Sequence, residues 1–427
     1  MLFNLMCLYV SLYYIRPTEW VPGIIDAPLF LGVGIICMAA IFFSALSGRI
    51  KLIGGGSEAM MVGFIISIIC SHLSRGYLGG VYASLMSFFP VMVGYFLITS
   101  SINSRKRLNS FMLLLISLSS FLAFEGWLQH ATGLSHGGMD AYVEHKMNAE
   151  GTLVELQRIR WYGVFNDPND LGLALVIVLP FLLEMLKNKR YLLPLLCLPL
   201  ISVALYYTNS RGSILASLVS VMAYFTIRYR SMKGMAAGLI LGSGLLVFGP
   251  SRMSQLSSSE ASAHGRVEAW YQGYQMLKSH PLFGVGQGRF VDFHTITAHN
   301  SFVLVMSELG IVGTFFFAGI FYYSFNWLWK YFCQNNENKF SAADIGMLSS
   351  IYGSLFGLLT SMFFLSRAYV LIPFILLAMT SAGARVIDTD DGAIEVNSSV
   401  ALKDLKNIAI ITFMQLLFVN IVVKLCI

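Results

Sequence analysis

Several short polar segments interrupt this otherwise apolar sequence, and each of them contains arginine or histidine. They occupy residues 158–172, 208–213, 265–270, 280–289 and 298–302. The planar guanidinium of arginine binds phosphate oxygens in bidentate fashion, which lysine does not do. Histidine titrates near neutral pH and can take a proton from a hydroxyl group. Together these residue types favour chemistry between a phosphate-bearing substrate and a hydroxyl.

The stretch Thr208-Asn-Ser-Arg-Gly-Ser213 predicts the start of a helix with Arg211 in its first turn. A positive charge is unfavourable there, because the helix dipole already places its positive end at the N-terminus. A bound anion would reverse this effect, since the backbone amides, Ser210 and Arg211 would all act on it. We therefore predict an anion-binding role for Arg211 rather than snorkelling at the membrane interface.

The segment that begins at Arg160 reads RWYGVFNDPNDLG. Asp167 suits the N-cap of a helix and Pro168 suits its first turn, so neither residue requires a ligand to explain it. Capping does not explain Arg158 or Arg160. We predict that both arginines contact substrate, and Asp167 stays a candidate for the same site.

Two further clusters follow: Gly265-Arg266 with Trp270, and a glycine-rich stretch from His280 to Arg289. The three alternating glycines of that stretch follow no apolar strand and open no helix of a βαβ unit, so we reject a dinucleotide-binding loop. Close backbone packing or approach to a ligand is the expected use of these glycines. Arg266, Trp270 and Arg289 are candidates for substrate binding.

His299 stands in Ala-His-Asn-Ser-Phe, directly before an apolar segment that contains Glu308 and Gly310. At a membrane mouth this histidine could take the proton from an attacking hydroxyl. A single histidine at such a position is also often a hydrogen-bonded helix cap. The residues by themselves leave both interpretations open.

Membrane-spanning helices must position these polar segments. Hydrophobic residues make up 56% of the 427 residues and charged residues only 12%, which excludes an ordinary soluble domain. A helix of about 20 apolar residues crosses a hydrocarbon core of about 30 Å. Such segments occur at residues 2–15, 27–46, 59–73, 78–101, 108–130, 168–187, 191–208, 212–228, 233–249, 300–326, 344–366, 368–385 and 406–425. The sequence predicts an all-α polytopic membrane protein with about 12–13 transmembrane helices.

The distribution of basic residues predicts a cytoplasmic N-terminus, because lysine and arginine concentrate in alternate loops. The predicted exterior basic residues are mostly arginine: Arg16, Arg75, Lys146, Arg158, Arg160, Arg211, Arg252, Arg266, Lys278, Arg289 and Arg367. Topology alone does not require arginine there. Two polar exterior segments, at about 131–167 and 250–299, contain aromatic residues, and we expect ordered periplasmic loops that cover the exterior mouth.

The predicted domain organisation is a transmembrane transferase domain at residues 1–385 that includes both loops. A cytoplasmic linker at 386–405 and a C-terminal helix at 406–427 follow it. The six cysteines form no CxxC pair and no cluster with histidine at metal-ligand spacing, so we predict neither a disulfide framework nor a metal site. The net charge of +6 fits membrane topology, and no basic run interleaved with aromatics indicates nucleic-acid binding.

Taken together, these segments resemble the O-antigen ligase and O-antigen polymerase superfamily of bacterial envelope glycosyltransferases. The similar pieces keep the family's order along residues 158–313. The opening Arg16-Pro-Thr-Glu-Trp20 is also similar to a subgroup of these ligases that is associated with exopolysaccharide or exosortase loci. The combination of motifs is fairly specific, although no single motif is.

The resemblance implies a metal-independent, inverting glycosyltransferase of the membrane-embedded C-type architecture, with no cofactor. Its donor would be an undecaprenyl-diphosphate-linked glycan, and its active site would face the periplasm from the bacterial inner membrane. By position, Arg211 and Arg266 match the family's arginines for the donor diphosphate, and His299 matches the histidine for acceptor activation. Arg160 would be a third phosphate contact, and His280 would hold its loop.

The motifs leave three acceptors open: lipid A-core, a growing glycan and a protein. These correspond to an O-antigen ligase, a repeat-unit polymerase of O-antigen or exopolysaccharide, and a protein-directed oligosaccharide ligase. From a different class, a lipid-linked-glycan transporter or flippase would also need many spans. Such proteins usually have related halves and a polar site near the bilayer midplane. Here the polar residues gather at exterior helix ends, which favours a transferase.

Overall fold

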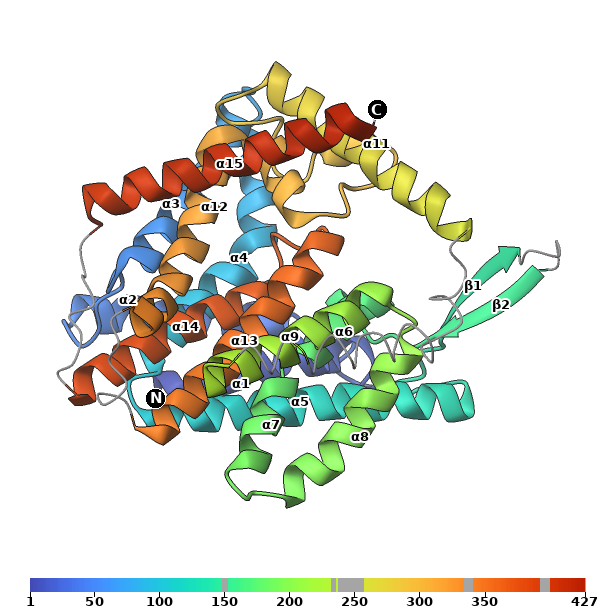
Figure 1. The fold of residues 1–427 in the computed structure, drawn as a ribbon, viewed down its shortest axis with the longest axis vertical. Coiled ribbons are helices and arrows are strands. Elements are labelled where there is room, and N and C mark those ends of the chain that lie inside the picture. The colour runs from blue at the N-terminus through green and yellow to red at the C-terminus, as the bar shows by residue number, and fades with distance from the viewer. Residues whose placement is uncertain (148–152, 232–235, 237–256, 334–340, 392–399, 427) are drawn as a thin grey trace.

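A computed structural model of the protein describes residues 1–147, 153–231, 236, 257–333, 341–391 and 400–426. Figure 1 shows a helical bundle. Its α-helices are α1 Leu2–Ile15, α2 Leu29–Leu46, α3 Gly56–Leu73, α4 Leu78–Ser101, α5 Arg105–Thr132, α6 Pro168–Val176, α7 Leu179–Lys187, α8 Leu192–Tyr207, α9 Arg211–Tyr229, α11 Ser257–Ser279, α12 Ser301–Cys333, α13 Ala342–Phe364, α14 Leu371–Asp391 and α15 Leu402–Cys426. One antiparallel hairpin, β1 Tyr142–Met147 and β2 Leu153–Arg158, projects from it.

The all-α membrane architecture is confirmed. Within the described residues, nine helical segments are long and apolar enough to cross a membrane, and α6 and α7 form one of these segments together. The apolar helices α8 and Leu371–Ile387 of α14 are shorter. The first predicted segment becomes α1, which has only 14 residues. The predicted span at 233–249 and the predicted exterior residue Arg252 lie outside the described residues.

The two predicted exterior loops contain secondary structure of their own. The segment 131–167 contains the hairpin, and the segment 250–299 contains the whole of α11, a 23-residue helix. The predicted linker at 386–405 is partly helical, because α14 continues to Asp391 and α15 already begins at Leu402. The proposed division into domains stays a prediction.

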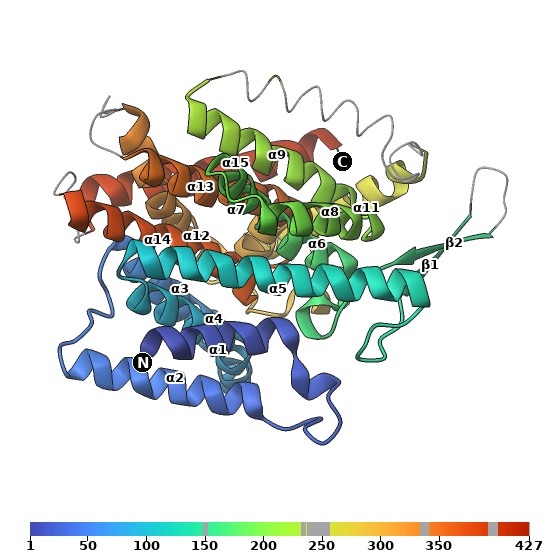
Figure 2. The same ribbon diagram turned by 90° about the horizontal axis from the view of Figure 1, so that it is seen from below.

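The bundle is built from pairs of packed helices. Helix α9 packs along α13, α3 along α12, α4 along α14 and α5 along α8. Seen from below, α1 and α2 form one side of the bundle, and both pack against α4 (Figure 2). Large buried aromatic residues such as Phe64, Phe88 and Tyr352 fill the interior. Burial of this kind holds helices together by close packing.

Charged side chains at each end of the bundle contact partners at the same end. Residues predicted to be cytoplasmic contact helix ends on the same side, as in the pairs Arg105–Asp344, Arg228–Glu184 and Arg385–Glu58. Residues predicted to be exterior contact one another, as in Arg367–Asp170 and Arg75–His280. The segregation agrees with the two-sided charge pattern of the sequence. Which end faces the periplasm stays a prediction.

Helix α12 is broken at Gly310, where φ is 64° and ψ is −160°. The segment after α11 fits into this break. The amides of Ile311 and Val312 donate to the carbonyls of Pro281 and Leu282, at 2.8 and 3.1 Å. In the other direction, the amides of residues 285 and 286 donate to the carbonyls of residues 307 and 308. The break therefore has its backbone groups paired, as a membrane protein requires.

Glycine is required on both sides of this contact. A Cβ on Gly310 would lie 2.6 Å from the carbonyl carbon of Leu282, and a Cβ on Gly284 would overlap the backbone of Glu308. Both glycines also have positive φ angles. The predicted use of the glycine-rich stretch for close backbone packing is thus confirmed at Gly284.

We expect Gly310→Ala to lower the free energy of unfolding by roughly 2–4 kcal/mol, because it adds backbone strain and overlap with a neighbouring segment. The measurement is the apparent melting temperature of the purified protein in detergent. Gly32→Ala is the control, since Gly32 lies in α2 with nothing within 4 Å of an added Cβ. Equal melting temperatures for the two variants would contradict this account of the break.

Candidate functional site

A cavity of about 460 Å³ opens between the base of the hairpin and the start of α6. We call it the arginine pocket, because Arg158, Arg160 and Arg367 all line it. Asp167 is the carboxylate in its lining. Each of the three arginines also contacts a carboxylate outside the lining: Glu144, Asp140 or Asp170.

Arg158 is buried and holds the hairpin to the bundle. Its Nε donates to the carbonyl of Thr208 at 2.9 Å, and one terminal nitrogen donates to Asn169 Oδ1 at 3.0 Å. A further terminal nitrogen lies 3.5 Å from a Glu144 oxygen. These contacts join β2 to the ends of α8 and α6, so Arg158 positions the pocket wall.

Arg160 lies at the more open side of the pocket. Its guanidinium contacts Asp140 at 2.7 Å and donates to Asn166 Oδ1 at 3.2 Å. The carboxylate of Asp140 is 72% exposed, so water screens this ion pair and its net contribution to stability is small. An anion in the pocket could therefore compete for the guanidinium of Arg160 at low cost.

Arg367 and Asp170 form a paired contact at the floor of the pocket. Both guanidinium–carboxylate distances are 2.5 Å, and Asp170 is only 1% exposed. Ser301 Oγ accepts from the backbone amide of Arg367 at 2.9 Å and donates to the carbonyl of Leu365 at 2.6 Å. The pair thus ties the turn between α13 and α14 to the starts of α6 and α12.

Sequence reasoning missed this pair as part of the site. Arg367 counted only as one of the exterior arginines, and Asp170 lay unused within the segment that begins at Arg160. A signal was present, because a carboxylate one turn inside a buried apolar helix needs a cationic partner. The sequence did not show which exterior arginine would supply the charge.

Arg211 begins α9, as predicted, and Ser210 is the N-cap residue. Ser210 Oγ accepts from the amide of Ser213 at 3.2 Å and from its hydroxyl at 2.9 Å. The Ser210 side chain is therefore occupied by capping. The ring of Phe364 lies 5.7 Å from the guanidinium carbon of Arg266, and the same residue contacts the position of Gly212. Arg211 and Arg266 thus approach the end of α13 from two different helices.

The charge of Arg211 acts on Arg266. Burial lowers the pKa of Arg266, and the charge of Arg211 lowers it further. No hydrogen bond or ion pair joins Arg266 to another residue in the described part of the chain. Mutual repulsion of this kind makes the neighbourhood attractive to an anion.

Trp270 secures the contact between α11 and the segment that carries His299. Its indole nitrogen donates to the carbonyl of Ala298 at 3.0 Å, and its ring packs edge-on against Phe363 at 5.5 Å between centroids. Trp270 is buried. These contacts favour a positioning role for Trp270 over direct substrate binding.

His299 is within reach of charges from both groups of arginines. Burial lowers the pKa of His299 from 6.5, the charges of Arg266 and Arg367 lower it too, and Asp167 opposes them. The residue has a left-handed backbone with φ of 47°. Asn300 rather than His299 caps α12, because Asn300 Oδ1 accepts from the amides of Phe302 and Val303 at 2.9 and 3.1 Å. The imidazole is therefore not needed as a helix cap.

The structure brings most of the predicted site residues together, but not all of them. His299, Arg211, Arg266, Arg158, Arg160, Asp167, Ser210 and Trp270 lie around the arginine pocket or at the helix ends beside it. Asp167 also caps α6, as its sequence context predicted, by accepting from the amide of Asn169 at 2.8 Å. Arg289 lines a different cavity, beside His72 and Tyr77. The catalytic and binding roles of all these residues stay predictions.

The fold and the site define a multi-pass membrane protein with a cationic pocket at one end of its helices. A family model described as O-antigen ligase matches residues 195–318. This match covers under a third of the chain; it supports the resemblance to the O-antigen ligase and polymerase superfamily and, with it, a glycosyltransferase-like activity. No curated protein matches the chain. The matched segment includes Arg211, Arg266 and His299.

We expect Asp170→Ala to lower the free energy of unfolding by roughly 2–4 kcal/mol, because it leaves the Arg367 charge in a half-buried site without its carboxylate. Adding Arg367→Ala should recover part of that loss, since the uncompensated charge is then removed. The measurement is again the apparent melting temperature. Glu155→Ala is the control, because its pair with His145 is exposed and should contribute less than about 0.5 kcal/mol. A double variant less stable than Asp170→Ala would contradict the role of the pair.

Proposed function

We propose that this protein transfers a glycan from an undecaprenyl-diphosphate carrier to an acceptor hydroxyl at the periplasmic face of the inner membrane. The observation that carries the proposal is the position of His299. It lies where the charges of Arg266 and Arg367 both reach it, and Arg211 adjoins Arg266. This supports the proposal that His299 serves as the base for a hydroxyl while the arginines bind the diphosphate.

The departing diphosphate develops negative charge, which several cations or a metal ion must stabilise. Arg211 and Arg266 are proposed to bind it at the start of α9, where the helix dipole adds to their effect. Arg160, whose carboxylate partner is exposed, lines the neighbouring pocket and would extend this cationic surface. In this mechanism the guanidinium groups take the place of a divalent ion.

His299 is proposed to act as the general base. A neutral imidazole accepts the hydroxyl proton while the acceptor oxygen bonds to the anomeric carbon. The bond from that carbon to the diphosphate oxygen breaks, and its electron pair leaves with the diphosphate. A single displacement of this kind inverts the configuration at the anomeric carbon.

The donor site is common to a ligase and to a polymerase, so the same residues serve both proposals. We favour the ligase because the matching family model bears that description, and we keep the repeat-unit polymerase as the alternative. A transporter is disfavoured because the cationic residues lie at helix ends and in the segments between helices rather than midway along the spans.

We expect transfer from purified lipid-linked glycan to continue in EDTA, because arginine rather than a metal would stabilise the leaving group. Arg211→Ala, Arg266→Ala and His299→Ala should each lose roughly 100-fold or more of the transfer rate, which is the scale for removing one preorganised electrostatic group. The assay is product formation by proteins shown to insert in the membrane.

Arg49→Ala is the matched control, since this exposed arginine lies between α2 and α3, away from the pocket. Its transfer rate should equal that of the wild type. Activity abolished by chelation, or retained in all three site variants, would remove the proposed mechanism.

The pH dependence of transfer follows from the lowered pKa of His299. The base is active when neutral, so the rate should decline only as the pH falls through a value below 6.5. Arg266→Gln removes a charge that lowers this pKa. In this variant the decline of the residual activity on the acidic side should therefore shift to a higher pH. The measurement is kcat/KM against pH for both proteins. A limb that moves downward, or does not move, would exclude His299 as the titrating base.

A further inference from the structure

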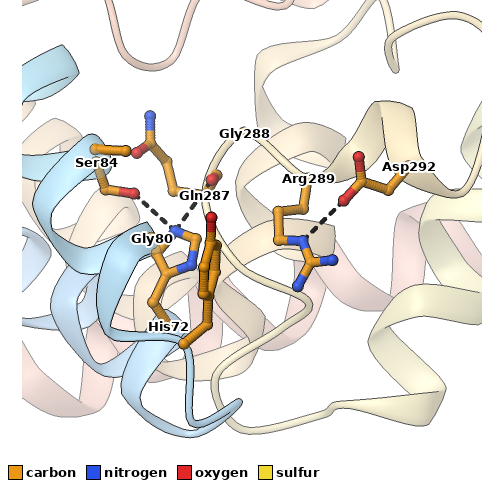
Figure 3. A pocket seen from close by; sticks show the side chains of 9 residues that line it. His72, Gly80, Ser84, Gln287, Gly288, Arg289 and Asp292 are labelled. Atoms are coloured by element: carbon orange, nitrogen blue, oxygen red, sulfur yellow. Dashed lines mark hydrogen bonds and ion pairs between the residues drawn. The ribbon is translucent and has the colours of Figure 1, made fainter.

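A second cavity, of about 350 Å³, lies where the turn between α3 and α4 meets the segment after α11. We call it the Tyr77 pocket. Its polar lining is His72, Ser84, Gln287, Arg289 and Asp292, and its lining shares no residue with that of the arginine pocket (Figure 3). The proposed transfer mechanism uses none of these side chains.

The wall that carries Gln287 and Arg289 is held in place by the broken helix α12. The amide of Gly286 donates to the carbonyl of Glu308 at 2.9 Å, and the amide of Phe290 donates to Glu308 Oε1 at 3.0 Å. Gly286 and Phe290 flank residues 287–289, which line the pocket. The cavity is therefore formed before any ligand arrives, which lowers the cost of binding.

The hydrogen bonds of His72 assign its tautomer. Its Nε2 lies 3.1 Å from the carbonyl oxygen of Gln287 and 2.7 Å from Ser84 Oγ, as the dashed lines in Figure 3 show. A carbonyl oxygen only accepts, so Nε2 carries the proton and Nδ1 has a lone pair. Nδ1 is buried and has no hydrogen-bond partner in the described segments.

This lone pair faces glycines. A Cβ on Gly286 would lie 3.1 Å from Nδ1, and a Cβ on Gly80, which lines the pocket, would overlap the same atom. An unpaired buried acceptor costs about 1–3 kcal/mol unless a donor reaches it.

The open side of the pocket is aromatic and carries balanced charges. Arg289 Nε donates to Asp292 Oδ2 at 2.8 Å, and the guanidinium lies 5.7 Å from the centre of the Tyr77 ring. The ring of Tyr77 is half exposed. One cation and one anion offset each other, so the charges of this lining are balanced.

Neutral hydroxyl-rich ligands match this lining. Planar amide, carboxylate and guanidinium groups donate and accept in pairs, and an exposed aromatic face packs against C–H groups. A phosphate group would instead meet the carboxylate of Asp292. The chemistry of the lining is thus that of a sugar subsite rather than a second anion site.

Helix α11 connects this pocket with the proposed transfer site. Arg266 lies near Arg211 and His299, and the helix ends at Ser279. Directly beyond its end, Arg75 donates to Nε2 of His280 and ties α11 to the turn between α3 and α4. The rise of 1.5 Å per residue places this end about 20 Å from Arg266. Figure 1 shows α11 running between these two regions.

We infer that the Tyr77 pocket binds the hydroxyl groups of an uncharged sugar unit in the glycan, several units away from the bond that is transferred. This inference rests on the proposed glycan transfer. The glycan could belong to the donor or to the acceptor, since both present the same hydroxyl chemistry. The pocket would then select for glycan length and hold the chain along α11.

The test compares glycans of different length in the transfer assay. One series pairs a fixed acceptor with undecaprenyl-diphosphate donors carrying one sugar or a full glycan, and the other pairs a fixed donor with short or long acceptors. For Tyr77→Ala and Arg289→Gln, the ratio of KM for the long glycan to KM for the short one should rise about tenfold in one series, which corresponds to about 1.4 kcal/mol. A higher KM ratio in the donor series means that the pocket binds the donor glycan, and a higher ratio in the acceptor series means that it binds the acceptor glycan.

Tyr82→Ala is the matched control, because Tyr82 is an exposed tyrosine of α4 that does not line the pocket. Its KM ratio should equal that of the wild type. If the wild type transfers glycan but both pocket variants behave as Tyr82→Ala in both series, the inference about the pocket is overturned alone. If the wild type transfers none of these glycans, the proposed function itself fails.

Discussion

The break in α12 is the constraint on which both polar regions depend. A helix that turns away from its axis inside a membrane leaves amide and carbonyl groups that lipid cannot satisfy. Here the segment after α11 supplies the missing partners, with Pro281 and Leu282 on one side of the break and Val285 and Gly286 on the other. This segment is held in place. It therefore also fixes the end of α11, which precedes it, and the wall of the Tyr77 pocket, which follows it.

Helix α11 is thereby fixed at two points. Its end is joined to the turn between α3 and α4 through Arg75 and His280, and its middle is joined to the segment before α12 by Trp270. Arg266, on α11, and His299, next to Ala298, thus belong to two segments that Trp270 holds together. Precise relative position is what a base and a leaving-group site require of each other.

The arginines at this end of the bundle differ in their partners. The guanidinium groups of Arg158 and Arg367 make tertiary contacts, and these contacts fix the walls of the pocket. Arg160 pairs with an exposed carboxylate, and Arg266 is partly buried next to another cation. The first pair of arginines builds the site, and the second pair is better placed to respond to an anionic substrate.

The sequence alone determined the membrane architecture and the order of the motifs. Apolar segments of spanning length are visible without any tertiary information, and so is a cap such as Asp167, because both depend on local spacing. Ser210 was expected to contact an anion, but its hydroxyl caps α9. The arginine-rich exterior also pointed to phosphate chemistry. The helical content of segment 250–299 was missed, because α11 is polar and has no strong apolar periodicity.

Only the tertiary structure decided which of these groups meet. Asp170 gains Arg367 from a turn almost 200 positions further along the chain, and Arg289 is assigned to a cavity with His72 instead of to the arginine pocket. Trp270 likewise becomes an anchor because its only polar group reaches the carbonyl of Ala298. Spacing along a chain fixes neighbours on one helix, whereas contacts between helices depend on packing that a single sequence does not reveal.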